Sequence, residues 1–398
     1  MLQAYFANLE SALKKKMEEK PTARRKFVYE IAKVGNRLFE EDWSSAWTTV
    51  FVPFEILNSM NVAGMFVEFV GAMLAGAGLS RPYFEKAESA GFSTDGCSYH
   101  RTVIGAAMER LLPPPDVLVG ATFPCMGGVK ALKRVGELYD VPVFVINVPY
   151  DDSPESVEYL VGQYKAMIDH VAEATGRKLD QGRLKRAMEL TNEARRYLLE
   201  VEELAKRVPS PVGPNDLKNF IINVLLLGTP AGVEVARAFR DELRDRVERG
   251  AAGLPNERYR LLWIQNRIQF RTSLLDELAR RHGANVVVDE LNHVYWGEMD
   301  PDDPLRSIAV RAVTHPLVGP ARRRVEVLLK LAREYRVDGV VNPSHWGCRQ
   351  NGGARGLFKE ALQAAGVPYV NLDVDCVDER NYSEAQLLTR LEAFLEVL

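Results

Sequence analysis

Residues 116–128 read Asp116-Val117-Leu118-Val119-Gly120-Ala121-Thr122-Phe123-Pro124-Cys125-Met126-Gly127-Gly128. The first half is a short apolar run typical of a buried strand, and the glycine-rich second half is typical of a loop at a strand end. A helix is predicted next, over 129–138, followed by a second strand over 142–148. Strands that alternate with helices at this spacing predict βαβ units and a parallel sheet.

The same alternation is found on both sides of this stretch. Toward the N-terminus, residues 48–52 are predicted as a strand and 101–112 as a helix. Toward the C-terminus, further strands are predicted over 259–264, 284–289, 337–342 and 368–372, with helices between them that include 325–335 and 354–365. The sequence therefore predicts an α/β fold with two parallel-sheet modules.

Two parts of the chain lack strand character. Both carry apolar residues at helical spacing and are predicted to be helical. The predicted division is a helical N-terminal segment over 1–45, a first α/β domain over 46–150, a helical connecting segment over 151–255, and a second α/β domain over 256–398.

Composition limits the class of function. The chain has 398 residues, of which 46% are hydrophobic and 26% charged, as in an ordinary globular protein. Its net charge of −3 argues against binding nucleic acid through the overall field. The most apolar stretch, residues 61–79, is interrupted by Glu68 and is predicted to be a buried helix and not a membrane span. With four cysteines and no secretory signal, we expect a cytoplasmic protein with reduced thiols and no membrane partner.

The four cysteines are the main chemical signal. Cys97 and Cys125 are 28 residues apart, as are Cys348 and Cys376, and both intervals read as cysteine, helix, strand, cysteine. This repetition predicts a duplicated architecture. Cys125, Cys348 and Cys376 each follow a predicted strand, and parallel sheets bind ligands at the carboxyl ends of their strands.

The residues alone leave three interpretations of these cysteines open. Free cysteines are often buried without any chemical role. Zinc is disfavoured, because no C-x2-C or H-x3–5-H spacing occurs. Alternatively, Cys97, Cys125 and Cys348, which lie beside glycine, proline or polar loop residues, together hold an iron–sulfur cluster.

Other motifs are absent or weak. The sequence has no G-x4-G-K-[ST], so ATP hydrolysis is assigned to a partner, and no G-x-S-x-G. Residues 76–81 begin like a dinucleotide-binding loop but lack its third glycine. The basic cluster 322–324 is interpreted as the solvated face of a helix, with phosphate contact as the alternative. Glu55, after the first predicted strand, is either a general acid or base or a charge at a helix N-terminus, and the local pattern favours the helix charge.

Together with their contexts, the cysteines make the chain resemble the 2-hydroxyacyl-CoA dehydratase and benzoyl-CoA reductase family, specifically a cluster-bearing subunit. The matching features are Pro53-x-Glu55, the three cysteine loops, Val337-Asp338-Gly339-Val340 and His345-Trp346-Gly347-Cys348-Arg349-Gln350. The C-terminal part also matches, with Gly366-Val367-Pro368, Asp373-x-Asp375 and Gln386-x-x-Thr389-Arg390-x-x-Ala393-Phe394-Leu395-Glu396. The resemblance covers the chain beyond its first few dozen residues.

The resemblance implies two Rossmann-like domains with a [4Fe–4S] cluster between them, held by Cys97, Cys125 and Cys348. It implies a homologous second subunit, in a heterodimer or homodimer, and a separate ATP-hydrolysing iron–sulfur activator. The implied activity removes water from a 2-hydroxyacyl-CoA through a ketyl radical after one-electron activation. The alternatives are reduction of an aromatic acyl-CoA, as in benzoyl-CoA reductase, and a non-catalytic electron-relay subunit.

The resemblance also implies candidate catalytic residues. Glu55 is expected to handle a proton near the leaving group. His345, close to Cys348, is the second candidate, with a backbone hydrogen bond as its alternative role. Cys376 is expected to be a packing thiol. The alternative is a fourth cluster ligand, which would close the iron that substrate needs and leave an electron-transfer protein.

Overall fold

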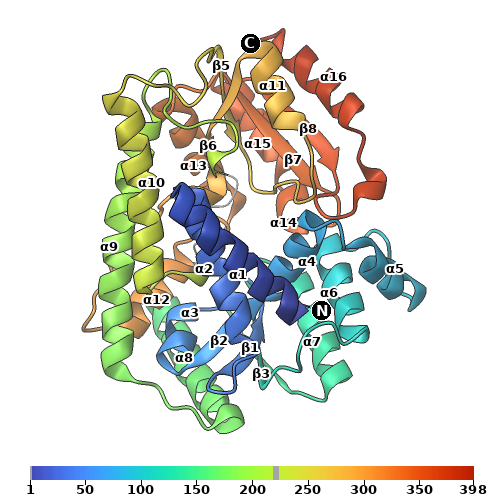
Figure 1. Ribbon diagram of the computed structural model, residues 1–398, viewed down its shortest axis with the longest axis vertical. Coiled ribbons are helices and arrows are strands. Elements are labelled where there is room, and N and C mark those ends of the chain that lie inside the picture. Colours follow the sequence, from blue (N-terminus) through green and yellow to red (C-terminus); the bar gives the residue numbers. More distant parts are fainter. Residues whose placement is uncertain (1, 218–223) are drawn as a thin grey trace.

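The computed structural model, which describes residues 2–217 and 224–398, contains two four-stranded parallel sheets, the first in the lower half of Figure 1 and the second in the upper half. The first sheet has the order β2-β1-β3-β4 and the second β6-β5-β7-β8. Their bounds are β1 (Ser44–Thr48), β2 (Val62–Phe66), β3 (Val117–Ala121), β4 (Val143–Ile146), β5 (Tyr259–Trp263), β6 (Ala284–Asp289), β7 (Gly339–His345) and β8 (Tyr369–Val374). The predicted α/β fold is confirmed, and the second sheet repeats the strand order of the first.

The duplicated topology does not follow the cysteine spacing. Cys125 comes after β3 and Cys348 after β7, which are the third strands of their sheets in chain order. Cys97 instead precedes a helix that leads into β3, whereas Cys376 follows the fourth strand, β8. Cys125 and Cys348 are therefore equivalent in the two sheets, and the equal 28-residue intervals do not mark equivalent segments.

Each sheet is surrounded by helices. Those of the N-terminal part are α1 (Leu2–Glu19), α2 (Ala23–Arg37), α3 (Phe54–Ser59), α4 (Val67–Gly76), α5 (Arg81–Ser89), α6 (Ser98–Met108) and α7 (Met126–Tyr139). Those of the C-terminal part are α11 (Leu274–His282), α12 (Pro304–Val313), α13 (Ala321–Glu334), α14 (Arg349–Gly352), α15 (Arg355–Ala364) and α16 (Glu384–Leu395). Short 3-10 turns span Glu290–Asn292 and Glu379–Asn381. No helix in the described ranges is long and apolar enough to span a membrane.

The segment between the sheets is helical, as predicted. It contains α8 (Pro154–Thr175), α9 (Gln181–Ala205) and α10 (Pro230–Glu248), with α10 packed along α9 (Figure 1). Local signals set these bounds, because Ser153, Asp180 and Thr229 each accept a backbone N–H from the first turn. The predicted domain boundaries at 45, 150 and 255 stay predictions.

Two local predictions in the first module are wrong. The strand predicted over 48–52 lies earlier, as β1, because the chain turns away after Thr48 and Phe51 adopts a left-handed φ of +68°. The helix predicted over 61–79 is divided into β2 and α4. Every residue of β2 is buried, so the strand lacks the alternation that separates a strand from a buried helix in sequence.

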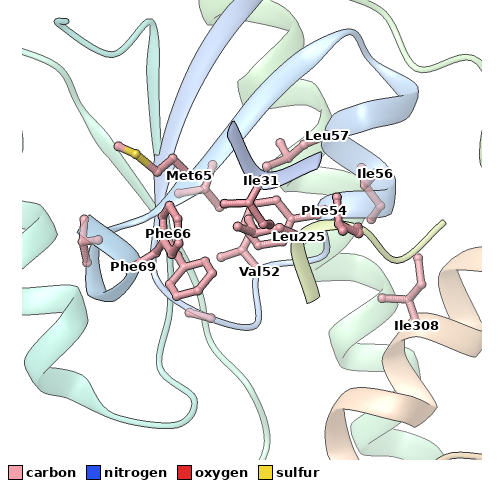
Figure 2. Close-up of a cluster of buried hydrophobic side chains, with 14 of the residues drawn as sticks. Ile31, Val52, Phe54, Ile56, Leu57, Met65, Phe66, Phe69, Leu225 and Ile308 are labelled. Carbon is pink, nitrogen blue, oxygen red and sulfur yellow. The ribbon is translucent and has the colours of Figure 1, made fainter. Parts of the chain in front are cut away.

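One continuous hydrophobic core joins distant parts of the chain. Figure 2 shows Ile31 of α2, Phe54 of α3 and Leu225 gathered in this cluster, with Ile308 of α12 at its edge. The same cluster includes Val340 of β7. The core therefore ties the first sheet and the connecting helices to the second sheet.

Candidate functional site

A cavity of about 840 Å³ is lined by three of the four cysteines, Cys97, Cys125 and Cys348. Each of them is the residue immediately before a helix, at the N-termini of α6, α7 and α14 respectively. Cys125 and Cys348 also follow the carboxyl ends of β3 and β7. The fold therefore brings together three thiols that are separated by up to 251 positions in the chain.

The sulfur of Cys97 has two imidazole neighbours. Burial alone raises the pKa of this thiol, but attraction and hydrogen bonds from His100 and His345 outweigh it and lower the pKa to about 5. His100 lies between Cys97 and Glu68, whose Oε1 is 3.1 Å from His100 Nε2. Burial opposes the charge on His100, but these two acidic neighbours raise the pKa of His100 well above its usual value. Cys97 is therefore held as a thiolate, the form that binds metals.

The other two cysteines also receive N–H donors. Burial raises the pKa of Cys125, partly offset by the charge of His100 and by a hydrogen bond from the backbone N–H of Gly128. The side-chain amide of Gln265 donates from Nε2 to Cys348 Sγ over 3.6 Å. Donors of this kind stabilise the negative charge on metal-bound sulfur.

His345, the last residue of β7, is buried and oriented by the backbone. Its Nδ1 accepts the backbone N–H of Cys376 at 3.1 Å, which fixes the orientation of the ring. Its Nε2 lies 3.4 Å from Cys97 Sγ. The backbone hydrogen bond that was the alternative role for His345 is therefore present, and it aims the opposite side of the ring at a cavity cysteine.

Two contacts hold the cysteine loops together. Gly347 packs against Cys97 so closely that an added Cβ would lie 2.3 Å from the Cα of Cys97. Only glycine permits this approach. Beside it, Ser98 Oγ donates to Asp375 at 2.5 Å and thereby joins the start of α6 to the loop after β8.

Cys376 differs from the other three cysteines in that it does not line the cavity. Its side chain is fully buried in the hydrophobic cluster of the second sheet and does not line the cavity. Burial raises the pKa of this thiol. These are the surroundings of a packing residue.

The donor set fits an iron–sulfur cluster better than a single metal ion. Among the residues that the structure describes, no three His, Cys, Asp or Glu side chains converge closely enough for one ion. A cluster of four irons holds its cysteines farther apart, because each binds a different iron. Three thiols around one cavity, each with an N–H donor, are consistent with that arrangement.

Glu55 lines a second, smaller cavity of about 100 Å³. Its side chain is 2% exposed, and one carboxylate oxygen accepts a hydrogen bond from Arg311 Nη1 at 2.6 Å. Phe51, Leu291 and Leu317 line both cavities and form the wall between them. Glu55 is therefore placed next to the cysteine cavity but is not brought into it.

Sequence reasoning missed several polar residues around the cysteines. His100 could have been found, because it lies one helical turn after Cys97. Nothing in the sequence indicated that Arg311 pairs with Glu55, because helix α12 is far from Glu55 in the chain. The prediction that residues 322–324 form a solvated face is wrong for Arg324, which is 1% exposed and paired with Glu290. Its position on α13 faces the second sheet, so the tertiary fold buries it.

Known proteins are similar to this chain over most of its length. The sequence model of the family described as 2-hydroxyglutaryl-CoA dehydratase, D-component, matches residues 49–398. The (R)-phenyllactyl-CoA dehydratase alpha subunit of Clostridium sporogenes is 25% identical, over 88% of this chain and 89% of that subunit. The alpha subunit of the lactoyl-CoA dehydratase of Anaerotignum propionicum is 24% identical over 88% and 90%. One subunit of the benzoyl-CoA reductase of Thauera aromatica is 27% identical over 78% of each chain. The match over residues 49–398 shows that this chain belongs to the 2-hydroxyglutaryl-CoA dehydratase D-component family, as its cysteine contexts predicted.

Proposed function

We propose that this chain is the iron–sulfur subunit of a 2-hydroxyacyl-CoA dehydratase, a lyase. The observation that carries the proposal is the convergence of Cys97, Cys125 and Cys348 on one cavity at the carboxyl edges of the two sheets. Two of the three relatives described above are dehydratase alpha subunits, aligned over nearly nine tenths of their lengths.

In this proposal, the three cavity cysteines hold a [4Fe–4S] cluster. When bound, such a cluster supplies a low-potential electron for the thioester carbonyl and, at an iron without a cysteine ligand, a Lewis-acid site. The burial of Cys376 in an apolar cluster supports three cysteine ligands instead of four. The cavity volume of about 840 Å³ leaves room for part of an acyl-CoA beside the cluster.

The chemistry of the proposed substrate explains why an electron is needed. A β-proton of a 2-hydroxyacyl thioester is not acidic, so ordinary elimination of water is blocked. One electron added to the carbonyl gives a ketyl radical, from which hydroxide leaves and the β-proton becomes acidic. Once that proton is removed, the electron is returned and an unsaturated acyl-CoA remains.

We assign the proton handling to Glu55. Arg311 holds one of its carboxylate oxygens, which fixes the orientation of the group. The wall between Glu55 and the cysteine cavity consists of Phe51, Leu291 and Leu317, so the proposal requires the acyl group to pass these side chains to reach Glu55. His345 has the role of a positioning residue, since its Nε2 faces the sulfur of Cys97.

The proposal includes two protein partners. The relatives that are named alpha subunits imply a second subunit, and we propose a homologous chain that pairs with this one. The proposed activator is a separate ATP-hydrolysing iron–sulfur protein that delivers the electron, as the family resemblance implies; the chain itself has no P-loop. We propose a cytoplasmic location for the assembly, in cells that live without oxygen.

The test is anaerobic purification of the chain with its partner subunit, followed by iron and sulfide analysis. Turnover is then measured with a strong one-electron reductant and a panel of 2-hydroxyacyl-CoA thioesters. Formation of an unsaturated acyl-CoA supports the dehydratase. Reduction of benzoyl-CoA instead establishes the reductase alternative, and a reducible cluster that no acyl-CoA perturbs spectroscopically establishes the electron-relay alternative.

A further inference from the structure

Gln265 is a polar residue in an unusual backbone conformation at the cavity wall. It follows β5 closely, and β5 pairs with β7, the strand that leads to Cys348. Its φ is +48°, in the left-handed region that residues other than glycine seldom adopt, and the residue is 8% exposed. Such conformations persist where surrounding contacts fix them, and they are frequent at functional sites.

Hydrogen bonds fix both ends of the Gln265 amide. Its Oε1 accepts a hydrogen bond from Arg324 Nη2 at 2.8 Å, while its Nε2 lies 3.6 Å from Cys348 Sγ. A guanidinium can only donate, so the oxygen of the amide must face Arg324. The NH2 group must then face the sulfur. The chemistry of its two neighbours therefore determines the orientation of the amide.

Arg324 is itself held from several sides. Its Nη2 donates to Glu290 at 2.7 Å, and its Nη1 donates to the side chain of Gln350 at 2.8 Å. Its guanidinium lies 4.6 Å from the centre of the Phe358 ring. Arg324 and Glu290 are both buried, and together they carry no net charge. The pair can therefore orient Gln265 without adding a net charge near the cysteine.

We propose that Gln265 is a positioning residue that donates an N–H hydrogen bond to the cluster through the sulfur of Cys348, and that the Arg324–Glu290 pair orients it. This inference rests on the proposed role of Cys348 as a cluster ligand. Donors to cysteine sulfur stabilise the more negative, reduced state of a cluster and so raise its reduction potential. Gln265 thus helps to set the reduction potential of the cluster, and with it how strong a reductant the cluster requires.

The experiment measures the midpoint potential of the cluster in anaerobically purified protein, together with iron content. Gln265→Leu removes the donor at similar size, and we expect the potential to shift to more negative values with iron retained. Gln269→Leu is the matched control, because Gln269 also lines the cavity but donates to the hydroxyl of Tyr99 and not to sulfur. This control is expected to keep the wild-type potential.

Arg324→Lys tests the orienting step, since lysine cannot donate to Gln265 and Glu290 in the same fork geometry. We expect it to shift the potential in the wild-type background but to add nothing in the Gln265→Leu background. An equal shift in both backgrounds would overturn the orienting role. An unchanged potential in Gln265→Leu would overturn the proposal as a whole.

Two further outcomes have distinct meanings. Loss of iron from both Gln265→Leu and the shorter amide Gln265→Asn contradicts the inference, because a tuning donor is not needed to bind iron. If instead the proposed function is wrong, the wild-type protein binds no iron, or Cys348→Ser retains all of its iron.

Discussion

The carboxylate of Glu55 and the guanidinium of Arg311 are 2.6 Å apart, although 256 positions separate them in the chain. Glu55 belongs to α3, after the first strand of the first sheet, and Arg311 belongs to α12, in the C-terminal part. Both side chains are largely buried, so the pair fixes the relation between these helices. The local pattern favoured Glu55 as a charge at a helix N-terminus. The structure shows that Glu55 also pairs with an arginine of a distant helix.

Replacing Glu55 by glutamine is expected to lower turnover while leaving iron content unchanged. Glutamine keeps the volume and can still accept a hydrogen bond from Arg311, but it cannot take a proton. Losses of about 10²–10⁴-fold are typical when a general acid or base is removed. The measurement is turnover per bound cluster.

Glu257→Gln is the matched control for that variant. Glu257 is also 2% exposed and also paired with an arginine, Arg260 at 2.6 Å, but it lines neither the cysteine cavity nor the cavity of Glu55. We expect this control to retain its turnover per cluster. If both variants lose activity equally, the effect of Glu55→Gln is structural, and the proton-handling role is wrong.

Three of the four cysteines are expected to be needed for iron binding, and the fourth is not. Serine replaces the thiolate by a poor ligand, so Cys97→Ser, Cys125→Ser and Cys348→Ser should each lose most of their iron. Cys376→Ser should keep its iron, because Cys376 lies in the apolar cluster of the second sheet and does not line the cysteine cavity. Iron analysis of the four anaerobic variants checks this, and full retention in any of the first three contradicts the ligand set.

Gly347→Ala is expected to separate the loops that carry Cys97 and Cys348. Its Cβ would meet backbone atoms of Cys97 at 2.3 Å, and backbone cannot move aside as a side chain can. We expect loss of most of the iron with little change in helix content by circular dichroism. The control is Gly356→Ala in α15, where an added Cβ has no neighbour within 4 Å. It should retain iron and gain up to about 1 kcal/mol of stability from helix propensity.

Stability is expected to fall below neutral pH because of His315. Burial, reinforced by the charges of Arg324 and Arg311, lowers the pKa of His315 to about 3 in the folded protein. In the unfolded chain the same side chain takes up a proton near pH 6.5. Between these two values the unfolded state binds more protons, so stability decreases as the pH falls, by at most about 1.4 kcal/mol per pH unit.

The check is the urea midpoint of wild type and His315→Gln at pH 7.5 and pH 5. Glutamine retains an acceptor for the N–H of Leu317, which His315 Nδ1 accepts at 3.0 Å. The wild type should lose more stability than the variant between the two pH values. Equal losses would mean that the protonation of His315 does not differ between the folded and unfolded states.

The sequence predicted best where local signals suffice. β3, the loop with Cys125 and the start of α7 follow from a short Val/Leu run, a glycine-rich turn and a helical pattern within some twenty residues. The helical character of the connecting segment was also predicted, because apolar residues recur there at helical spacing. β2 was missed because a fully buried strand lacks the alternation that distinguishes it from a buried helix.

The sequence by itself determined the α/β class, the parallel sheets, the family and which cysteines lie at strand ends or helix starts. These depend on periodicity and on residues that are close in the chain. Tertiary structure alone decided that Arg311 meets Glu55, that Arg324 is buried against Glu290, and that Cys376 is excluded from the cavity. The reason is physical: whether a charge is solvated or paired, and whether a thiol faces a cavity or a core, depends on elements that fold against it from distant parts of the chain.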